Sequence, residues 1–188
     1  MILLLGKSAS GKTALLDSIR KKGFNKVVTF STRPLRKGEE DGVDYHFITK
    51  DKFLDLIISG ELFEYRTYGT TGGLWYYGST KDCYEDNLSK VCILTPDGLE
   101  KVRKAGIENV VSFYIDADRE TRLERALNRG DNKKEVERRF ETDDFDFINL
   151  RTDFTIPNNG NLSLDTLADM IVDLYMKELE NRRLAYTE

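Results

Sequence analysis

The sequence predicts an α/β fold in which helices flank a parallel sheet. Three short apolar runs, at residues 2–5, 91–94 and 110–115, are of the kind that forms buried parallel strands. A segment with a helical spacing of apolar or charged residues follows each run. Alternation of these two patterns along one chain is typical of βα units around a parallel sheet.

The other elements follow from the same two patterns, taken in chain order. Apolar residues four apart predict a helix from Lys12 to about Gly23. Asp118 is a good N-cap for a charged helix that runs to about residue 128. The remaining predictions are strands over 27–30, 74–77 and 154–156, short helices over 53–57 and 99–105, a second charged helix from residue 135, and a core-packing helix over 164–175. The stretch between about 29 and 85 is rich in Tyr, Thr and Gly, which suggests an antiparallel insert.

Composition limits the class of protein. The 188 residues suit one compact domain, and 39% hydrophobic with 33% charged residues is expected of a folded protein outside the membrane. The first 50 residues hold ten Lys or Arg and five Asp or Glu, yet the whole chain has a net charge of −4, which argues against a nucleic-acid partner. Two cysteines without metal-ligand spacing, and no N-terminal apolar run longer than residues 2–5, favour a reduced, cytoplasmic protein.

Residues 6–13, GKSASGKT, match the phosphate-binding pattern GxxxxGK[ST] at every fixed position. The run lies between a predicted strand and a predicted helix, the context that this P-loop motif requires; the alternative is a chance glycine-rich turn. Glycines let the backbone wrap a phosphate, and a helix N-terminus supplies N–H donors. We expect Lys12 to reach the β- and γ-phosphates of a nucleoside triphosphate and Thr13 to hold Mg²⁺. The residues expected to bind this nucleotide, which the resemblance described below implies to be ATP, are Gly6, Lys7, Ser8, Ala9, Ser10, Gly11, Lys12 and Thr13.

A second basic stretch, residues 29–39, carries three cations within five residues. Arg33 and Arg36 lie three apart beside a proline, which indicates a loop. Two guanidinium forks on one loop suit bidentate binding of a phosphate. A solvated basic loop is the alternative, and composition alone does not separate the two.

Three runs that follow the P-loop carry a family resemblance: TFSTRPLRKGEEDGVDYHF at 29–47, ELFEY at 61–65 and YYGST at 76–80. In this order they resemble the nucleoside-monophosphate (NMP) part of guanylate kinase. The resemblance implies a P-loop NTPase-type parallel sheet flanked by helices, with an inserted mixed α+β NMP-binding part and a helical lid. The implied bounds are a core at about 1–28, 88–124 and 147–188, an NMP-binding part at about 29–87, and a lid at about 125–146.

The resemblance also implies an acceptor site for GMP. The residues that fall on the positions contacting its phosphate are Arg33, Arg36, Tyr45 and Tyr77. Those that fall on the positions reading the base are Thr29, Glu64, Ser79 and Asp97. A carboxylate such as that of Glu64 suits guanine, because guanine presents two adjacent donors and mismatched buried groups are left unpaired. Taken singly, Glu64 could be an exposed strand residue, and the two tyrosines could be core aromatics.

A lid over the triphosphate is the next implication. Arg125 and Arg129 lie four apart on a predicted helix and share one face. With Arg139, they fall on the arginines that neutralise charge on the transferred group. Asn158 falls where a late-strand residue contacts adenine. An ordinary salt-bridged helix is the alternative. The implied catalytic set is Lys12, Arg33, Arg125, Arg129 and Arg139.

Three departures from the family pattern stand out. Thr95-Pro96-Asp97 replaces the usual D-x-D, which removes one carboxylate from the expected Mg²⁺ and lysine network. Residues 70–74, TTGGL, look like extra length before Tyr77, and the basic lid segment is one residue short. These features suggest a divergent member of the family.

The main functional prediction is phosphoryl transfer from ATP to GMP or dGMP, with Mg²⁺, giving ADP and GDP. A small P-loop kinase for a different nucleotide or phosphorylated acceptor is one alternative. A non-catalytic interaction module is another, although such modules typically have eroded P-loops. The expected partners are ATP and GMP, with no nucleic acid and no membrane, and the oligomeric state is open.

Overall fold

The computed structural model describes residues 1–36, 38–70 and 73–185. The chain forms two compact units. The core unit comprises the residues up to Lys26 together with those from Leu88 onward, and the inserted unit comprises Val27–Asn87. Each unit has its own sheet, so each is described separately.

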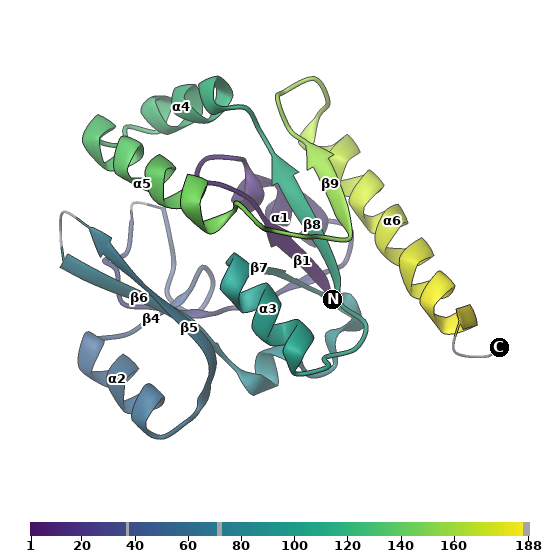
Figure 1. Ribbon diagram of the computed structural model, residues 1–188, viewed down its shortest axis with the longest axis horizontal. Helices are drawn as coiled ribbons and strands as arrows, with labels where there is room; N and C mark the ends of the chain where they lie inside the picture. Colours follow the sequence, from purple (N-terminus) through teal and green to yellow (C-terminus); the bar gives the residue numbers. More distant parts are fainter. Residues whose placement is uncertain (37, 71–72, 186–188) are drawn as a thin grey trace. The chain divides into compact units, whose positions relative to one another are not determined.

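The core unit is built on a five-stranded parallel sheet (Figure 1). Its strands are β1 (Ile2–Leu5), β2 (Asn25–Lys26), β7 (Lys90–Ile93), β8 (Val111–Asp116) and β9 (Phe154–Pro157), in the order β2-β7-β1-β8-β9. Every residue of the middle strand, β1, is buried. Such strands are covered on both faces, as the continuous apolar run at 2–5 predicted. The predicted α/β fold is therefore confirmed.

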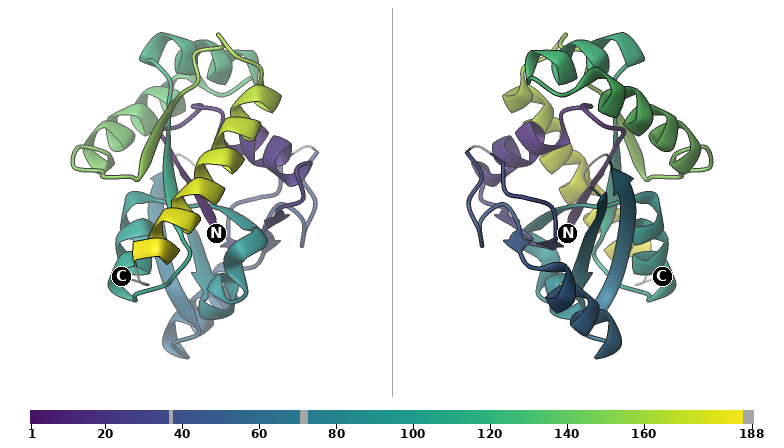
Figure 2. Two further views of the ribbon diagram at one scale, coloured as in Figure 1. Left: turned by 90° about the vertical axis from the view of Figure 1, so that its right-hand side faces the viewer. Right: turned by 90° about the vertical axis from the view of Figure 1, so that its left-hand side faces the viewer.

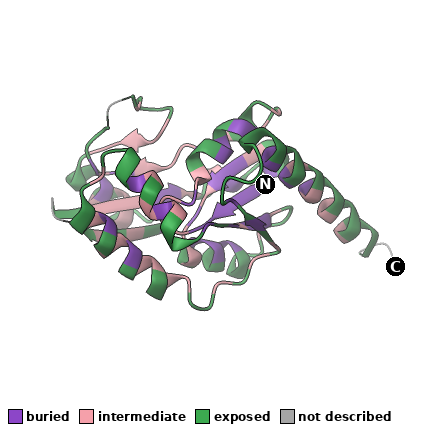
Figure 3. Ribbon diagram, turned by 90° about the horizontal axis from the view of Figure 1, so that it is seen from above, coloured by how far each residue is buried: buried purple, intermediate pink, exposed green. Residues whose placement is uncertain are grey.

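Helices cover both faces of this sheet (Figure 2). On one side, α1 (Lys12–Arg20) packs against α6 (Leu164–Ala185), and α3 (Pro96–Lys104) lies on the other side. Figure 3 shows buried core strands beside an α6 whose outer surface is exposed. The core between sheet, α1 and α6 consists of Ile2, Leu4, Leu15, Leu16, Ile19, Val91, Val111, Phe113, Ile115, Ile156, Leu167, Ala168, Ile171 and Tyr175. Among the described residues, no helix is long and apolar enough to cross a membrane.

Two further helices follow the carboxyl end of β8, namely α4 (Arg119–Asn128) and α5 (Lys133–Asp146). Their first turns are capped by side chains, as the polar residues before each helix favour. Asp118 accepts a hydrogen bond from the Thr121 amide at 2.7 Å, which confirms the predicted N-cap. Asn132 accepts from two amides at the start of α5, so this helix begins two residues before the predicted start.

The inserted unit is a four-stranded sheet with one helix. The strand order is β4-β3-β6-β5, formed by β3 (Phe30–Ser31), β4 (His46–Phe47), β5 (Leu62–Thr70) and β6 (Gly73–Thr80). The hairpin of β5 and β6 is antiparallel, as the composition suggested, but β3 and β4 pair in parallel. The helix α2 (Lys50–Ile58) packs on β6 through the buried ring of Phe53. Two 3-10 turns, η1 (Lys81–Tyr84) and η2 (Asn87–Ser89), lead back toward β7.

The strand predicted over 27–30 is wrong. β2 ends at Lys26, residues 27–29 have no regular structure, and Phe30 begins a strand of the other sheet. The apolar residues of this segment belong to a crossing between two sheets, and a periodicity argument cannot distinguish such a crossing from one strand. The TTGGL departure falls partly on residues 71 and 72, which lie outside the described residues.

Candidate active site

The P-loop lies between β1 and α1, where the sequence placed it. Three of its residues have positive φ angles: Gly6 at 158°, Ala9 at 61° and Gly11 at 96°. A side chain at Gly6 would meet the Ile115 carbonyl at 2.6 Å, so the glycine permits a close approach of loop and sheet. The loop closes on itself through a hydrogen bond from the Ser10 amide to the Lys7 carbonyl at 3.1 Å. Successive amides of a P-loop and the start of the helix that follows it form a nest of the kind that binds anions.

Lys12 reaches back over this loop from the first turn of α1. Its Nζ donates to the carbonyls of Gly6 at 2.6 Å and Lys7 at 2.9 Å. Burial lowers the pKa of Lys12 to about 8, and the neighbouring Arg122 and Arg129 act in the same direction. Asp143 opposes them by favouring the charged form. The ammonium is therefore short of counter-charge, and an added phosphate would supply it.

The carbonyl of Ser10 is the acceptor that ties the P-loop to two predicted site residues. Asn158, which is buried just after β9, donates its Nδ2 to this carbonyl at 2.8 Å. Arg125 of α4 donates its Nη1 to the same oxygen at 3.4 Å. Both contacts hold the loop backbone, and the predicted contact of Asn158 with adenine stays a prediction.

The helices α4 and α5 pack on each other through a small apolar cluster of Ala126, Val136 and Phe140. Ala9 of the P-loop and Leu123 of α4 also contact this cluster. The pair of helices therefore lies next to the phosphate-binding loop within the core unit, and it carries all three of the predicted lid arginines.

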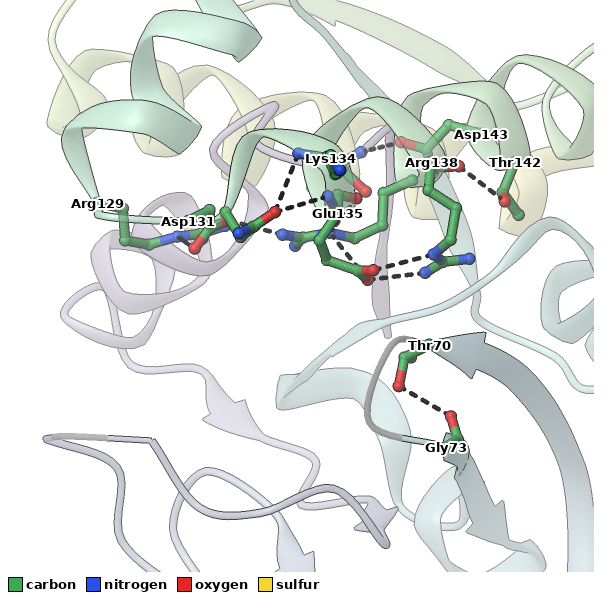
Figure 4. A network of polar contacts seen from close by, with 12 residues as sticks. Thr70, Gly73, Arg129, Asp131, Lys134, Glu135, Arg138, Thr142 and Asp143 are labelled. Atoms are coloured by element: carbon green, nitrogen blue, oxygen red, sulfur yellow. Dashed lines mark hydrogen bonds and ion pairs between the residues drawn. The ribbon is translucent and has the colours of Figure 1, made fainter.

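Two of those arginines are held by one carboxylate (Figure 4). Arg129 donates two hydrogen bonds to Asp131, at 3.2 and 2.5 Å, and Arg139 donates a third at 2.8 Å. Burial alone would raise the pKa of Asp131, but these hydrogen bonds outweigh it and hold the pKa below its usual value. Arg138 is bound separately, by two hydrogen bonds to Glu135. Arg129 and Arg139 therefore contact the same carboxylate, whereas Arg125 contacts the P-loop.

Acidic residues of α5 also contact the P-loop, although no expectation from the sequence included these contacts. The Ser8 amide donates to Asp143 Oδ2 at 2.6 Å, and Lys7 Nζ donates to Asp144 Oδ1 at 2.6 Å. Asp144 accepts as well from Arg119 of α4 at 3.2 Å. A carboxylate therefore takes one of the amides that the motif reserves for phosphate. The only signal was a charged pair on the helix that follows the lid break.

A second candidate anion site lies in the inserted unit, around Arg33. This guanidinium is buried and donates to both oxygens of Glu39, at 2.6 and 2.5 Å. It also lies over the rings of Tyr45 and Phe47, at 5.1 and 5.2 Å from their centroids. Glu39 accepts a further hydrogen bond from the Arg36 amide at 2.8 Å. The carboxylate thus occupies the fork that the sequence assigned to a phosphate.

Tyr77 completes this cluster from β6. Its ring packs edge-on against Tyr45, with 5.9 Å between centroids. Burial raises the pKa of Tyr77, against the opposing charges of Arg33 and Arg36. The structure therefore brings together all four residues predicted to contact the acceptor phosphate, which are Arg33, Arg36, Tyr45 and Tyr77.

The base-reading prediction falls on a buried polar chain in the β5–β6 hairpin. Glu64 accepts a hydrogen bond from Ser79 Oγ at 2.7 Å, and Ser79 Oγ lies 2.9 Å from Tyr84 Oη. Glu64 and Ser79 are paired in the register of the two strands. At Gly78 a side chain would meet the Glu64 carbonyl at 2.8 Å, so this glycine lets the two strands approach beside the carboxylate. At the far end of the hairpin, Thr70 Oγ1 donates to the Gly73 carbonyl at 2.8 Å (Figure 4).

Two predicted base-reading residues stand apart from this chain. Thr29 precedes β3, and its carbonyl accepts a hydrogen bond from the His46 amide at 2.8 Å. Asp97 is exposed in the first turn of α3, in the core unit. Just before it, Thr95 caps α3 by accepting from the Gly98 amide at 3.1 Å. Thr95 therefore performs the capping for which a carboxylate is equally suited. The binding roles of Thr29 and Asp97 stay predictions.

A P-loop after the middle strand of a parallel sheet, with a lysine folded over it, defines a P-loop nucleotide-binding protein. The guanylate kinase family model matches residues 1–172. A guanylate kinase from Anaplasma phagocytophilum (strain HZ) is 29% identical, covering 95% of this chain and 86% of that protein. One from Pseudoalteromonas translucida (strain TAC 125) is 31% identical, covering 82% and 80%. The crystal structure of guanylate kinase from Anaplasma phagocytophilum matches with a TM-score of 0.65 and 25% identity, over 95% of this chain and 86% of that one. The chain belongs to the guanylate kinase family, which confirms the resemblance.

Proposed function

We propose that this protein transfers the γ-phosphoryl group of ATP to GMP or dGMP, giving ADP and GDP or dGDP. The observation that carries the proposal is the complete P-loop, over which Lys12 is held with too little negative charge nearby to balance its ammonium group. Family membership supplies the acceptor. An intact donor site also argues against a purely non-catalytic interaction module.

On the donor side, the P-loop amides and the start of α1 bind the phosphates. Lys12 supplies a positive charge at the β- and γ-phosphates, and Arg125, Arg129 and Arg139 supply more as charge builds up on the transferred group. Arg129 and Arg139 are already placed together by Asp131. Little covalent work is needed of the protein, because phosphoryl transfer depends mainly on positioning and charge.

The residues present also fit Mg²⁺. Thr13 is exposed in the first turn of α1, next to Lys12. Mg²⁺ at kinase sites usually takes one or two protein oxygens, with phosphates and waters completing its shell, so one hydroxyl there is a suitable ligand. When bound, the ion neutralises charge on the phosphates. Thr95, whose hydroxyl caps α3, does not supply the negative charge of the carboxylate in the usual D-x-D.

On the acceptor side, we assign the phosphate of GMP to Arg33, Arg36, Tyr45 and Tyr77, and the base to Glu64 and Ser79 with Thr29 and Asp97. The Glu64 carboxylate is buried beside Ser79 Oγ, from which it accepts a hydrogen bond. An ionised carboxylate is an acceptor with two oxygens, which suits the two adjacent donors of guanine. The predicted acceptor part at about 29–87 and lid at about 125–146 remain proposals. Closure of both over the substrates would exclude water and prevent hydrolysis of ATP.

The test is ADP release with ATP, Mg²⁺ and one acceptor at a time from GMP, dGMP, AMP, UMP and CMP. We expect turnover with GMP and dGMP only. Turnover with a different acceptor would transfer the proposal to a related kinase activity. Absence of both turnover and ATP binding would leave only the interaction module. Neither Cys83 nor Cys92 forms a disulfide among the described residues, which suits the proposed cytoplasmic location.

A further inference from the structure

Arg122 of α4 is a buried cation, and one of its guanidinium nitrogens has no hydrogen-bond acceptor among the described residues. Its side chain is held from two sides: Nε donates to the Ala117 carbonyl at 3.1 Å, and the guanidinium lies 4.3 Å above the ring of Phe140. The residue is only 3% exposed. Its Nη1 nevertheless has no hydrogen-bond partner within the described parts of the chain. A buried charged donor without a partner is costly, so this atom requires an explanation.

The nearest counter-charge is the Asp143 carboxylate, which does not reach it. Asp143 Oδ2 lies 4.0 Å from Arg122 Nη1, beyond hydrogen-bond distance. The same oxygen accepts from the Ser8 amide of the P-loop at 2.6 Å. One carboxylate oxygen therefore stands between a P-loop donor and an open guanidinium donor, and it satisfies only the first.

A phosphate group at this place could satisfy both donors. It carries more charge than a carboxylate and presents three oxygens in a tetrahedral array, so one can accept from the Ser8 amide while another approaches Arg122. Arg122 and Asp143 both act electrostatically on Lys12 of the P-loop. Burial has the largest effect and lowers the pKa of Lys12, whereas Asp143 raises this pKa and Arg122 lowers it. The two residues therefore lie at the donor site.

We propose that Arg122 is a further phosphate-binding residue of the donor site, and that Asp143 occupies the phosphate position while the site is empty. A phosphate oxygen of ATP then replaces the carboxylate at the Ser8 amide, and Arg122 gains its missing partner. The proposal rests on the proposed function, since it requires ATP at the P-loop. It adds an arginine to the lid set of Arg125, Arg129 and Arg139.

The two residues should affect affinity with opposite signs. Arg122→Gln removes the cation that would bind the phosphate, so ATP affinity should fall about 10-fold or more. Asp143→Asn removes the charge that competes for the site, so affinity should rise about 3- to 10-fold. A purely structural pair would give no such opposition, because loss of either partner would only loosen the helices around the P-loop.

The experiment is calorimetric titration with ATP and Mg²⁺, and with inorganic tripolyphosphate as a probe that has no base. It uses Arg122→Gln, Arg122→Lys and Asp143→Asn beside the unchanged protein. Arg122→Lys keeps the charge but loses the planar fork, so it should recover part of the affinity. Lys104→Gln is the matched charge-loss control, since that exposed lysine of α3 pairs with Glu100 on the same helix. GMP affinity should be the same in all variants.

Wild-type affinity in Arg122→Gln, or weaker binding in Asp143→Asn, would overturn the proposal. Thermal melts identify a variant that fails to fold, and if Arg122→Gln does so, the sign of the Asp143→Asn effect decides. If the unchanged protein binds neither ATP nor tripolyphosphate, the proposed function fails together with this inference. If it phosphorylates GMP normally while the variants bind ATP equally, only the assignment of Arg122 fails.

Discussion

The two candidate anion sites of this protein are built differently. In the core unit, Lys12 of the P-loop donates to carbonyl oxygens, while Asp144 pairs with Lys7 of the same loop and Asp143 accepts from the Ser8 amide. In the inserted unit, the cation is Arg33, which is paired through two of its nitrogens with Glu39, six residues away. Within the described residues, Lys12 therefore has no carboxylate bonded to it directly, whereas Arg33 has one. Removing the cation should therefore cost activity at the first and also stability at the second.

Lys12→Ala should produce the largest effect on activity. Loss of the charge at the transferred phosphate should lower kcat by about 10³-fold or more. The fold should stay intact, because the lysine is desolvated and its ammonium donates to the backbone carbonyls of Gly6 and Lys7 rather than to a carboxylate of the described residues. Steady-state kinetics and a urea titration check both statements. Near-normal turnover would remove Lys12 from the chemistry, and a large loss of stability would erase the contrast with Arg33.

Arg33→Ala should lower the free energy of unfolding by about 3 kcal/mol, because it leaves the Glu39 carboxylate largely buried without its partner. It should also raise KM for GMP while leaving the affinity for ATP unchanged. The matched control is Arg33→Ala combined with Glu39→Gln, which should restore part of the stability but not the KM. Unchanged stability in the single variant would show that the pair is not structural.

Glu64→Gln tests the base rather than the phosphate. The amide keeps one oxygen for Ser79 Oγ, so the hairpin should stay folded. The amide cannot accept from both guanine donors, so kcat/KM for GMP should fall roughly 10- to 100-fold. This corresponds to a loss of about 1.5–3 kcal/mol of transition-state stabilisation. The acceptor panel with and without the substitution measures this. If the preference for GMP over AMP is the same in both, Glu64 does not read the base.

The smallest expected effect is the pH dependence that follows from Lys12. With a folded-state pKa of about 8, the lysine loses its proton in the nucleotide-free protein above that pH, and ATP binding must then restore it. ATP affinity should fall above pH 8, with proton uptake visible as a buffer-dependent binding enthalpy. Without nucleotide, the unfolded chain binds more protons than the folded one between about pH 8 and the ordinary value of 10.5. The contribution of Lys12 to stability therefore rises through that window. A flat affinity from pH 7 to 9.5 would contradict the expectation.

Sequence reasoning was most accurate where neighbouring residues determine the geometry. The P-loop, the Asp118 cap and the buried strand at 2–5 depend on a few consecutive residues, and all were predicted. Arg33, Tyr45 and Tyr77 could be brought together only by the family resemblance, since β3, β4 and β6 join them by pairings that no local pattern specifies.

Contacts across helix interfaces could not be predicted. Ser8 and Asp143 are 135 residues apart, and their hydrogen bond depends on how α5 packs beside the loop. Arg122 was overlooked because a charged residue on a charged helix suggests an exposed face, whereas the ring of Phe140 buries it. β5 was not predicted as a strand because Glu64 and Arg66 interrupt its apolar residues.

α5 is one unbroken helix from Lys133 to Asp146, and this continuity has a mechanical consequence. Arg139 and Asp143 lie four residues apart on this helix, so they share a face and would move together if the helix moves as a rigid body. Any motion that lifts the carboxylate away from Ser8 also shifts the guanidinium that Asp131 holds. If ATP displaces the Asp143 carboxylate from the Ser8 amide, as proposed, the same motion of α5 would therefore also move Arg139, one turn earlier in the helix.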